Sequence, residues 1–245
     1  MDTIPSPRVD VQPDPATLST AVAGELLSRI ADAQAAGGVP AVCLTGGTIA
    51  EEVHREIGRL GAASAVDWSA VDFWWGDERY VDLDSSDRNS RGAREAFLEP
   101  LGVPASRIHE MPTPSSACSV DEGAKAYSAE LRTKGSGEFL VTMLGIGPDG
   151  HIASLFPGFP QLHVDDQIAV GVTGSPKPPP ERVTLTYPAL GHSASVWFLV
   201  SGEGKADAVR RALADDGSIA ETPARGVQGK SETIWFVDQA AASQI

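Results

Sequence analysis

Short apolar runs alternate along the chain with longer stretches in which apolar residues recur every third or fourth position. The short runs predict β-strands and the longer stretches predict amphipathic α-helices. Strands are expected over 39–45, 71–76, 138–145, 167–173, 182–187, 195–202 and 232–238. Helices are expected over 14–38, 49–60, 119–134 and 205–216. Because nearly continuous apolar strands need cover on both faces, the pattern predicts a three-layer α/β fold, a mostly parallel sheet with helices on both faces.

Capping residues mark two of the expected helix starts. Asp14 stands at an N-cap position, with Pro15 at the first helical position and Gly37 as a stop. Ser119 and Glu122 have the spacing of a capping box. These signals agree with the hydrophobic pattern and define where the helices begin.

Length and composition favour one globular domain. The 245 residues show no repeat and no shift in composition, so we predict a single domain over 1–245 with an extended N-terminal arm over about 1–13. No apolar run approaches the ~20 residues of a membrane span, and the polar, Pro-rich start lacks the pattern of a signal peptide, so neither is expected. Cys43 and Cys118 suggest no disulfide framework, which favours a cytoplasmic location.

The formal net charge of −14 limits the possible partners. Such a chain repels nucleic acid and anionic membranes, so neither is expected to bind. An anionic ligand would need a pocket that gathers cations locally. Since ligands of parallel sheets bind beyond the C-terminal ends of the strands, the loop after each strand is the place to look.

The loop after the first predicted strand contains Gly46, Gly47 and Thr48 directly before a helix. Free N–H groups at the helix start, together with the Thr48 hydroxyl, can form a phosphate-sized anion site. A plain strand-to-helix turn explains the same residues, so both readings stay open.

The loop after the second predicted strand is long and polar. It contains Asp77 and Arg79 at its start and Asn89 further along. Long irregular loops in compact domains are often functional, although a solvated acidic loop is the simpler interpretation.

The third loop contains a match to the pattern G-x-G-x-x-G: Gly145, Gly147 and Gly150. A dinucleotide fingerprint requires a long crossover helix after its third glycine, but Pro157 ends any helix within two turns. Asp149 would also repel a pyrophosphate. We therefore interpret the glycines as scaffolding for Asp149 and His151.

Three cations lie in later loops. Lys177 and Arg182 flank three prolines, which stiffen the loop and would hold both cations at low entropic cost. A rigid solvated connector is the alternative. Lys205 falls in the first turn of a helix, where it opposes the helix dipole unless an anion binds there.

Five segments together resemble the 6-phosphogluconolactonase family in order and spacing: LTGGT, WWGDERYV…SSDRNS, LGIGPDGHIASLFPG, KPPPERVTLTYPAL and FLVSGEGKADAV. The resemblance covers roughly residues 15–240. Glucosamine-6-phosphate deaminases of the same superfamily also carry a D-G-H loop, but continue it with F-N-E-P and read D-E-Y where this chain reads Asp77-Glu78-Arg79. Both differences favour the lactonase.

The resemblance implies a Rossmann-like fold of NagB/RpiA type and hydrolysis of 6-phospho-D-glucono-1,5-lactone, without a metal or an organic cofactor, by a monomer or homodimer. It implies His151 as the general base, Asp149 as the residue that orients it, and Arg79 in contact with substrate oxygens or loop carboxylates. The residues expected to bind substrate or its phosphate are Gly46, Gly47, Thr48, Asp77, Asn89, Lys177, Arg182 and Lys205.

Two other functions stay open. A deaminase–isomerase of amino-sugar phosphates would use Asp77 as a base between C1 and C2. A sugar-phosphate sensor on the same fold would need no catalysis, but the chain shows no basic helix-turn-helix segment and retains both Asp149 and His151.

Overall fold

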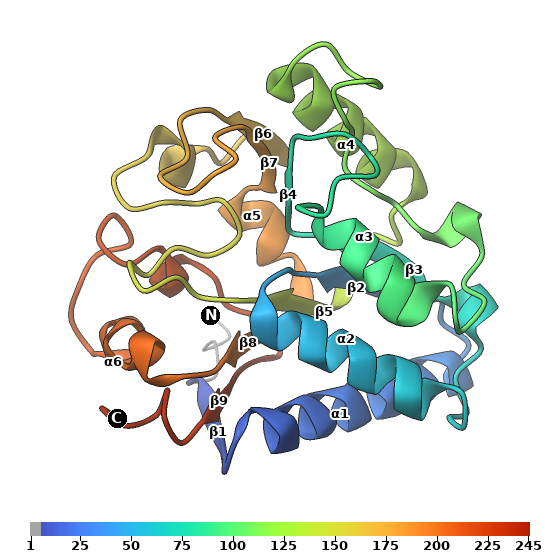
Figure 1. Cartoon of the computed structure of the whole chain (residues 1–245), viewed down its shortest axis with the longest axis horizontal. Coiled ribbons are helices and arrows are strands. Elements are labelled where there is room, and N and C mark those ends of the chain that lie inside the picture. Colours follow the sequence, from blue (N-terminus) through green and yellow to red (C-terminus); the bar gives the residue numbers. More distant parts are fainter. Residues whose placement is uncertain (1–5) are drawn as a thin grey trace.

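The computed structural model describes residues 6–245, and its centre is a sheet of six parallel strands (Figure 1). Across the sheet the order is β1-β9-β8-β5-β2-β3. The strands are β1 (Arg8–Gln12), β2 (Ala41–Leu44), β3 (Asp72–Trp75), β5 (Phe139–Leu144), β8 (Ser193–Val200) and β9 (Glu232–Asp238). The predicted parallel α/β architecture is confirmed.

Side chains that alternate along these strands point into two separate cores. In β3, Phe73 and Trp75 join one cluster of buried side chains, whereas Trp74 joins the other. In β9, Phe236 and Trp235 divide in the same way. This period-2 division explains why the strands read as continuous apolar runs: both faces are buried.

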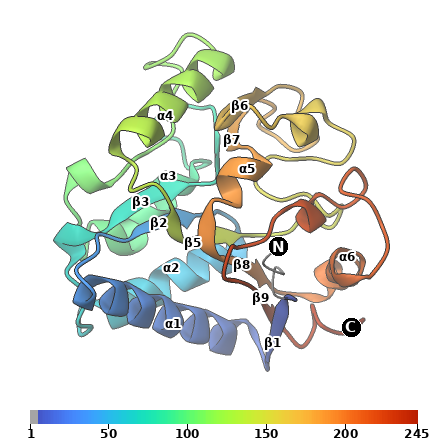
Figure 2. The same ribbon diagram turned by 180° about the vertical axis from the view of Figure 1, so that it is seen from behind.

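Helices cover both faces of the main sheet. On one face α1 (Pro15–Ala35) and α2 (Thr48–Gly61) lie side by side (Figures 1 and 2), and α3 (Asn89–Ala93) lies beside α2. The other face packs against α4 (Val120–Lys134), α5 (Tyr187–Leu190) and α6 (Ala206–Leu213). None of the helices in residues 6–245 combines the length and apolar character needed to span a bilayer.

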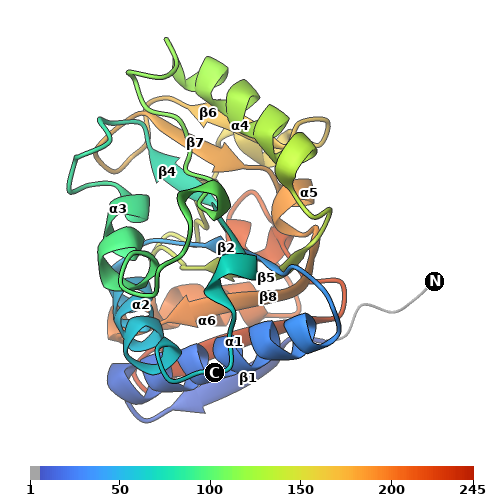
Figure 3. The same cartoon turned by 90° about the vertical axis from the view of Figure 1, so that its right-hand side faces the viewer.

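A second sheet corrects the sequence-based topology. β4 (Asp77–Arg79), β7 (Arg182–Leu185) and β6 (Ala169–Val172) form an antiparallel sheet in that order, between the main sheet and α4 (Figure 3). The sequence pattern had assigned β6 and β7 to the mostly parallel sheet and had placed Asp77 in a loop. The reason is the short connection over 173–181: it lets β7 return beside β6, whereas a parallel pair needs a longer crossover.

The N-terminal region and the helix caps follow the expectations, with two refinements. Of the predicted arm over 1–13, residues 1–5 lie outside the described residues, and residues 8–12 form β1 against β9. Asp14 caps α1 by accepting a hydrogen bond from the Thr17 N–H at 2.7 Å. Ser119 caps α4, but the Glu122 carboxylate accepts from the N–H of Cys118 instead of closing the capping box on Ser119.

Candidate active site

A pocket lies at the C-terminal edge of the main sheet, where the loops after β3, β2, β5 and β8 meet. These four strands are neighbours, so segments far apart in sequence converge there. The second sheet adds residues from β4, β7 and the loop before β7. The lining residues are Thr45, Gly46, Gly47, Asp77, Arg79, Asn89, Gly145, Ile146, Gly147, His151, Ala153, Lys177, Arg182 and Lys205.

The first loop brings only its glycines to the pocket. A Cβ on Gly46 would lie 1.8 Å from Oδ1 of Asn89, so only glycine fits against that side chain. Gly47 has φ of 102°, a conformation that glycine adopts without strain. Thr48 begins α2 beyond this turn; it is exposed and is absent from the pocket lining in the described chain. The structure therefore does not place the Thr48 hydroxyl with the other predicted phosphate ligands.

The loop after β5 builds a histidine–carboxylate pair. Nδ1 of His151 lies 2.5 Å from Oδ1 of Asp149. Gly147 makes this geometry possible, because a Cβ there would lie 2.0 Å from Nδ1 of His151. The imidazole ring packs on Phe156, with ring centroids 4.7 Å apart. In the described chain no long helix follows Gly150 before β6. The G-x-G-x-x-G match is therefore not followed by the crossover helix that a dinucleotide fingerprint requires.

The Asp149–His151 contact also sets the charge of the carboxylate. Partial burial by itself raises the pKa of Asp149, but the hydrogen bond and the charge of His151 outweigh it and lower the pKa to about 2. Asp149 is therefore ionised at neutral pH and accepts the Nδ1–H of His151. That tautomer leaves Nε2 with a lone pair, and among residues 6–245 no partner engages Nε2.

Asp77 and Arg79 stand two positions apart on β4, so their side chains share one face of the strand, and both line the pocket. Oδ2 of Asp77 accepts a hydrogen bond from Oγ of Ser154 at 2.6 Å and lies 3.9 Å from Nη1 of Arg182. Arg79 donates through Nη1 to Oδ1 of Asn89. Its Nε is buried and has no partner within the described chain. Arg79 as a whole lines the pocket, and its guanidinium carries a positive charge suited to a ligand oxygen.

The remaining predicted cations also reach the pocket. Arg182 donates to the backbone carbonyls of Lys177, Pro178 and Pro179 and thereby holds the Pro-rich loop together. The same side chain also lines the pocket. Nζ of Lys205 donates to the carbonyl of Ile146 at 2.6 Å. Burial lowers the pKa of Lys205, and the neighbouring Lys177 charge lowers it further. Cations held close together in this way indicate a site suited to an anion.

Gly145 and Gly147, interpreted from the sequence as scaffolding, line the pocket beside His151. Sequence reasoning missed three other lining residues: Thr45, Ile146 and Ala153. Thr45 stands inside the recognised LTGGT segment, so its position was available from the sequence. Ile146 and Ala153 carried no chemical signal. Ala153 has φ of 47°, a left-handed conformation that is rare outside glycine and that concentrates at functional sites.

The assembled groups are suited to acid–base chemistry on an anion. A histidine with a free Nε2, oriented by an ionised carboxylate, can take a proton from water. Four cationic side chains line the same pocket in a chain whose net charge is −14: Arg79, Lys177, Arg182 and Lys205. The geometry therefore favours hydrolysis of a small anionic substrate.

Comparison with known proteins agrees with this geometry. The model of the family described as glucosamine-6-phosphate isomerases/6-phosphogluconolactonase matches residues 13–235. A 6-phosphogluconolactonase of Streptomyces coelicolor is 39% identical over 98% of this chain and 95% of its own length. One of Mycobacterium tuberculosis is 39% identical over 98% and 99%, respectively. The crystal structure of 6-phosphogluconolactonase from Thermotoga maritima matches with a TM-score of 0.83 at 27% identity, covering 95% of this chain and 100% of that chain. This chain thus belongs to the glucosamine-6-phosphate isomerase/6-phosphogluconolactonase family.

Proposed function

We propose that the protein hydrolyses 6-phospho-D-glucono-1,5-lactone to 6-phospho-D-gluconate, a step of the oxidative pentose phosphate pathway. The observation that carries the proposal is the His151–Asp149 pair in a pocket lined by four cations. The lactonase names of the relatives support it. The single domain over 1–245, the cytoplasmic location and a monomeric or homodimeric state remain predictions from the sequence.

In the proposed reaction, Nε2 of His151 removes a proton from a water molecule as its oxygen attacks C1 of the lactone. The carbonyl electrons move onto the exocyclic oxygen, and Asp149 stabilises the imidazolium that forms. When the tetrahedral intermediate collapses, the C1–O5 bond breaks and the imidazolium returns its proton to the departing ring oxygen. General-base help of this kind contributes about 10²–10⁴-fold.

Binding is assigned to the cations of the pocket. The guanidinium of Arg79 is suited to an oxygen of the sugar or of the intermediate. We assign the 6-phosphate to Lys177 and Lys205, with the backbone N–H groups of Gly46 and Gly47, because a dianion relieves the repulsion between the two ammonium groups. Binding energy from this remote group positions C1 for attack and contributes to the rate.

The environment of Asp77 argues against a deaminase–isomerase. That reaction needs a carboxylate free to move a proton between two carbons. The Asp77 carboxylate is buried and already engaged by Ser154 and Arg182. No observation in the described residues favours this reaction over the lactonase.

The test is a coupled assay for 6-phosphogluconate from freshly made lactone, with the spontaneous hydrolysis rate subtracted. We expect turnover by the wild-type protein and no ammonia from glucosamine 6-phosphate. His151→Asn should lose about 10²–10⁴-fold in kcat while 6-phosphogluconate still binds. Wild-type-like turnover by His151→Asn would refute the general-base assignment, and ammonia release would favour the deaminase.

A further inference from the structure

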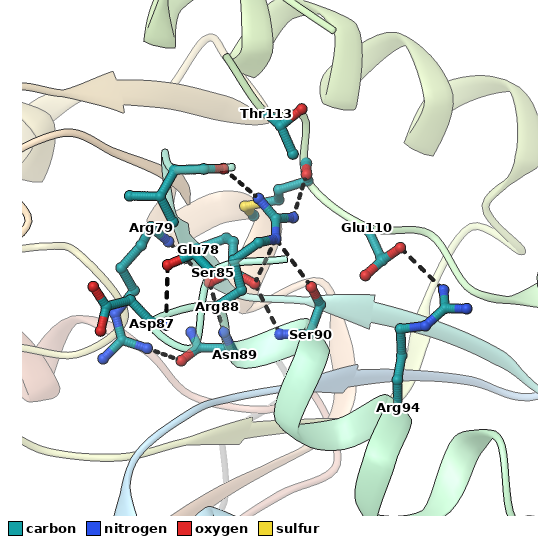
Figure 4. A network of polar contacts seen from close by, with 12 residues as sticks. Glu78, Arg79, Ser85, Asp87, Arg88, Asn89, Ser90, Arg94, Glu110 and Thr113 are labelled. Atoms are coloured by element: carbon teal, nitrogen blue, oxygen red, sulfur yellow. Dashed lines mark hydrogen bonds and ion pairs between the residues drawn. The ribbon is translucent and has the colours of Figure 1, made fainter. Parts of the chain in front are cut away.

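Glu78 is a buried carboxylate next to the pocket that no step above uses. Its side chain is 1% exposed and does not line the pocket. Figure 4 shows its two oxygens at the centre of a network between β4 and the start of α3. A buried charge is expensive to retain without partners, so the partners of Glu78 show what it does.

Three backbone N–H groups donate to this carboxylate. Oε1 accepts from the N–H of Arg79 at 2.9 Å and from that of Asn89 at 2.8 Å. Oε2 accepts from the N–H of Ser90 at 2.9 Å. One side chain therefore ties together the backbone of two pocket residues that lie ten positions apart in the sequence.

The side chains of those two residues then meet in the pocket. Arg79 donates through Nη1 to Oδ1 of Asn89, and Nδ2 of Asn89 donates to the carbonyl of Asp77 at 3.1 Å. Asn89 also packs against Gly46 of the first loop. With its Nη1 held in this way, the Arg79 guanidinium has a fixed place in the pocket wall.

Arg88 balances the charge of the carboxylate from the side away from the pocket. Its fully buried guanidinium lies 3.9 Å from Oε2 of Glu78 and is anchored on the Met111 carbonyl at 2.7 Å. Burial raises the pKa of Glu78, whereas Arg88 and the three backbone N–H groups oppose that rise. Because N–H donors point at both oxygens, the ionised form is the one that fits this network.

We propose that Glu78 is a positioning residue for the reaction, acting through the backbone of Arg79 and Asn89 to aim the Arg79 guanidinium at the substrate. The inference rests on the lactonase function proposed above. Glu78 itself touches no substrate. Its loss lets β4 and the start of α3 separate, so Arg79 leaves its place while the fold remains.

The experiment compares Glu78→Gln with Asp72→Asn. Gln retains the shape of Glu78 but turns an N–H₂ group toward Ser90 and Arg88, so we expect kcat/KM to fall about 10- to 100-fold. Asp72 is a matched control: it is a buried carboxylate on β3, paired with Arg107 and His109 at the opposite end of that strand from the pocket. Asp72→Asn should lower Tm and change kcat/KM by less than about twofold.

A double-mutant cycle separates positioning from general destabilisation. In an Arg79→Met background, Glu78→Gln should cost less than about threefold, because the residue it positions is gone. An equal loss in both backgrounds, or unchanged kcat/KM in Glu78→Gln, overturns the proposal. If Glu78→Gln does not fold, Glu78→Asp retains the charge with a shorter reach and should show the same coupling to Arg79.

An inactive wild-type protein would overturn the lactonase function and not this inference. Glu78 is then tested by calorimetric binding of 6-phosphogluconate. Affinity should fall in Glu78→Gln and stay unchanged in Asp72→Asn; equal affinity in all three proteins overturns the positioning role.

Discussion

Gly147 lies where even a methyl group collides with the His151–Asp149 pair. A Cβ at this position would stand 2.0 Å from Nδ1 and 2.1 Å from Cε1 of His151, and 2.3 Å from Oδ1 of Asp149. Optimal contacts between such atoms are about 3.5–4.0 Å. In Gly147→Ala the imidazole and the carboxylate must therefore each move by more than about 1 Å.

The size of the expected effect follows from which atoms move. All three colliding atoms belong to the ends of side chains, so the fold can accommodate the methyl group at the low end of the ~1–3 kcal/mol cost of overpacking. Catalysis has no such tolerance, since a 1 Å misplacement costs about 10²-fold. We expect Gly147→Ala to lose about 10²-fold or more in kcat, with a small decrease in Tm.

The same motif supplies the control. A Cβ on Gly145 meets only the carbonyl oxygen of Gly46, at 3.8 Å, and neither Gly145 nor Gly147 has a positive φ. Gly145→Ala adds its methyl group at the pocket wall without touching the His151–Asp149 pair, so it should lose much less kcat than Gly147→Ala in the coupled lactonase assay. A Gly147→Ala protein that is folded and fully active would falsify the placement of the reacting histidine. An equal loss of kcat in both variants would show that the glycines are needed for the conformation of the loop backbone, and not for the space around the imidazole.

Two further predictions concern the phosphate and the acid limit of stability. Lys177→Ala should raise KM for the phosphorylated lactone about tenfold and leave hydrolysis of unphosphorylated glucono-1,5-lactone unchanged; equal KM for both proteins refutes the phosphate assignment. Burial lowers the pKa of His54 from 6.5 to about 4, and its Nε2 has no partner in residues 6–245. Between pH 6.5 and 4 the unfolded chain therefore binds a proton that the folded chain does not, and stability falls by roughly 3 kcal/mol over that range. Denaturant titrations at several pH values give the free energy of unfolding as a function of pH. In His54→Leu this free energy should fall less between pH 6.5 and 4 than in the wild-type protein. An equal fall in both proteins refutes the prediction.

Much of the site was accessible from local sequence because its residues stand in loops directly after predicted strands. The parallel arrangement of β2, β5 and β8 brings Gly46, His151 and Lys205 to one edge, and that arrangement follows from the hydrophobic pattern. The Asp149–His151 pair is also local, since two residues separate its members. Thr48 differs from these residues: it follows the turn at Gly47, is exposed and is not among the pocket-lining residues of the described chain.

Other features depend on contacts between distant segments. The antiparallel sheet of β4, β7 and β6 joins segments separated by a large part of the chain, and no local period encodes which strands pair. The engaged carboxylate of Asp77 depends on such contacts, because Arg182 reaches it from β7 and Ser154 from the loop after β5. Ala153 is another feature that the sequence does not predict. Its backbone is left-handed, but the position holds no glycine that would indicate such a conformation.

The sequence by itself determined the strands other than β1 and β4, the four longest helices and the loops that carry chemistry. These depend on hydrophobic periods of about 2 and 3.6 residues and on turn-forming residues, all of which act over a few positions. The tertiary structure alone decided which of two neighbouring carboxylates is engaged in the pocket and which one organises the backbone. Asp77 and Glu78 are adjacent in sequence, but their roles differ because each meets different partners from distant segments: Ser154 and Arg182 for Asp77, and the backbone of Asn89 and Ser90 for Glu78.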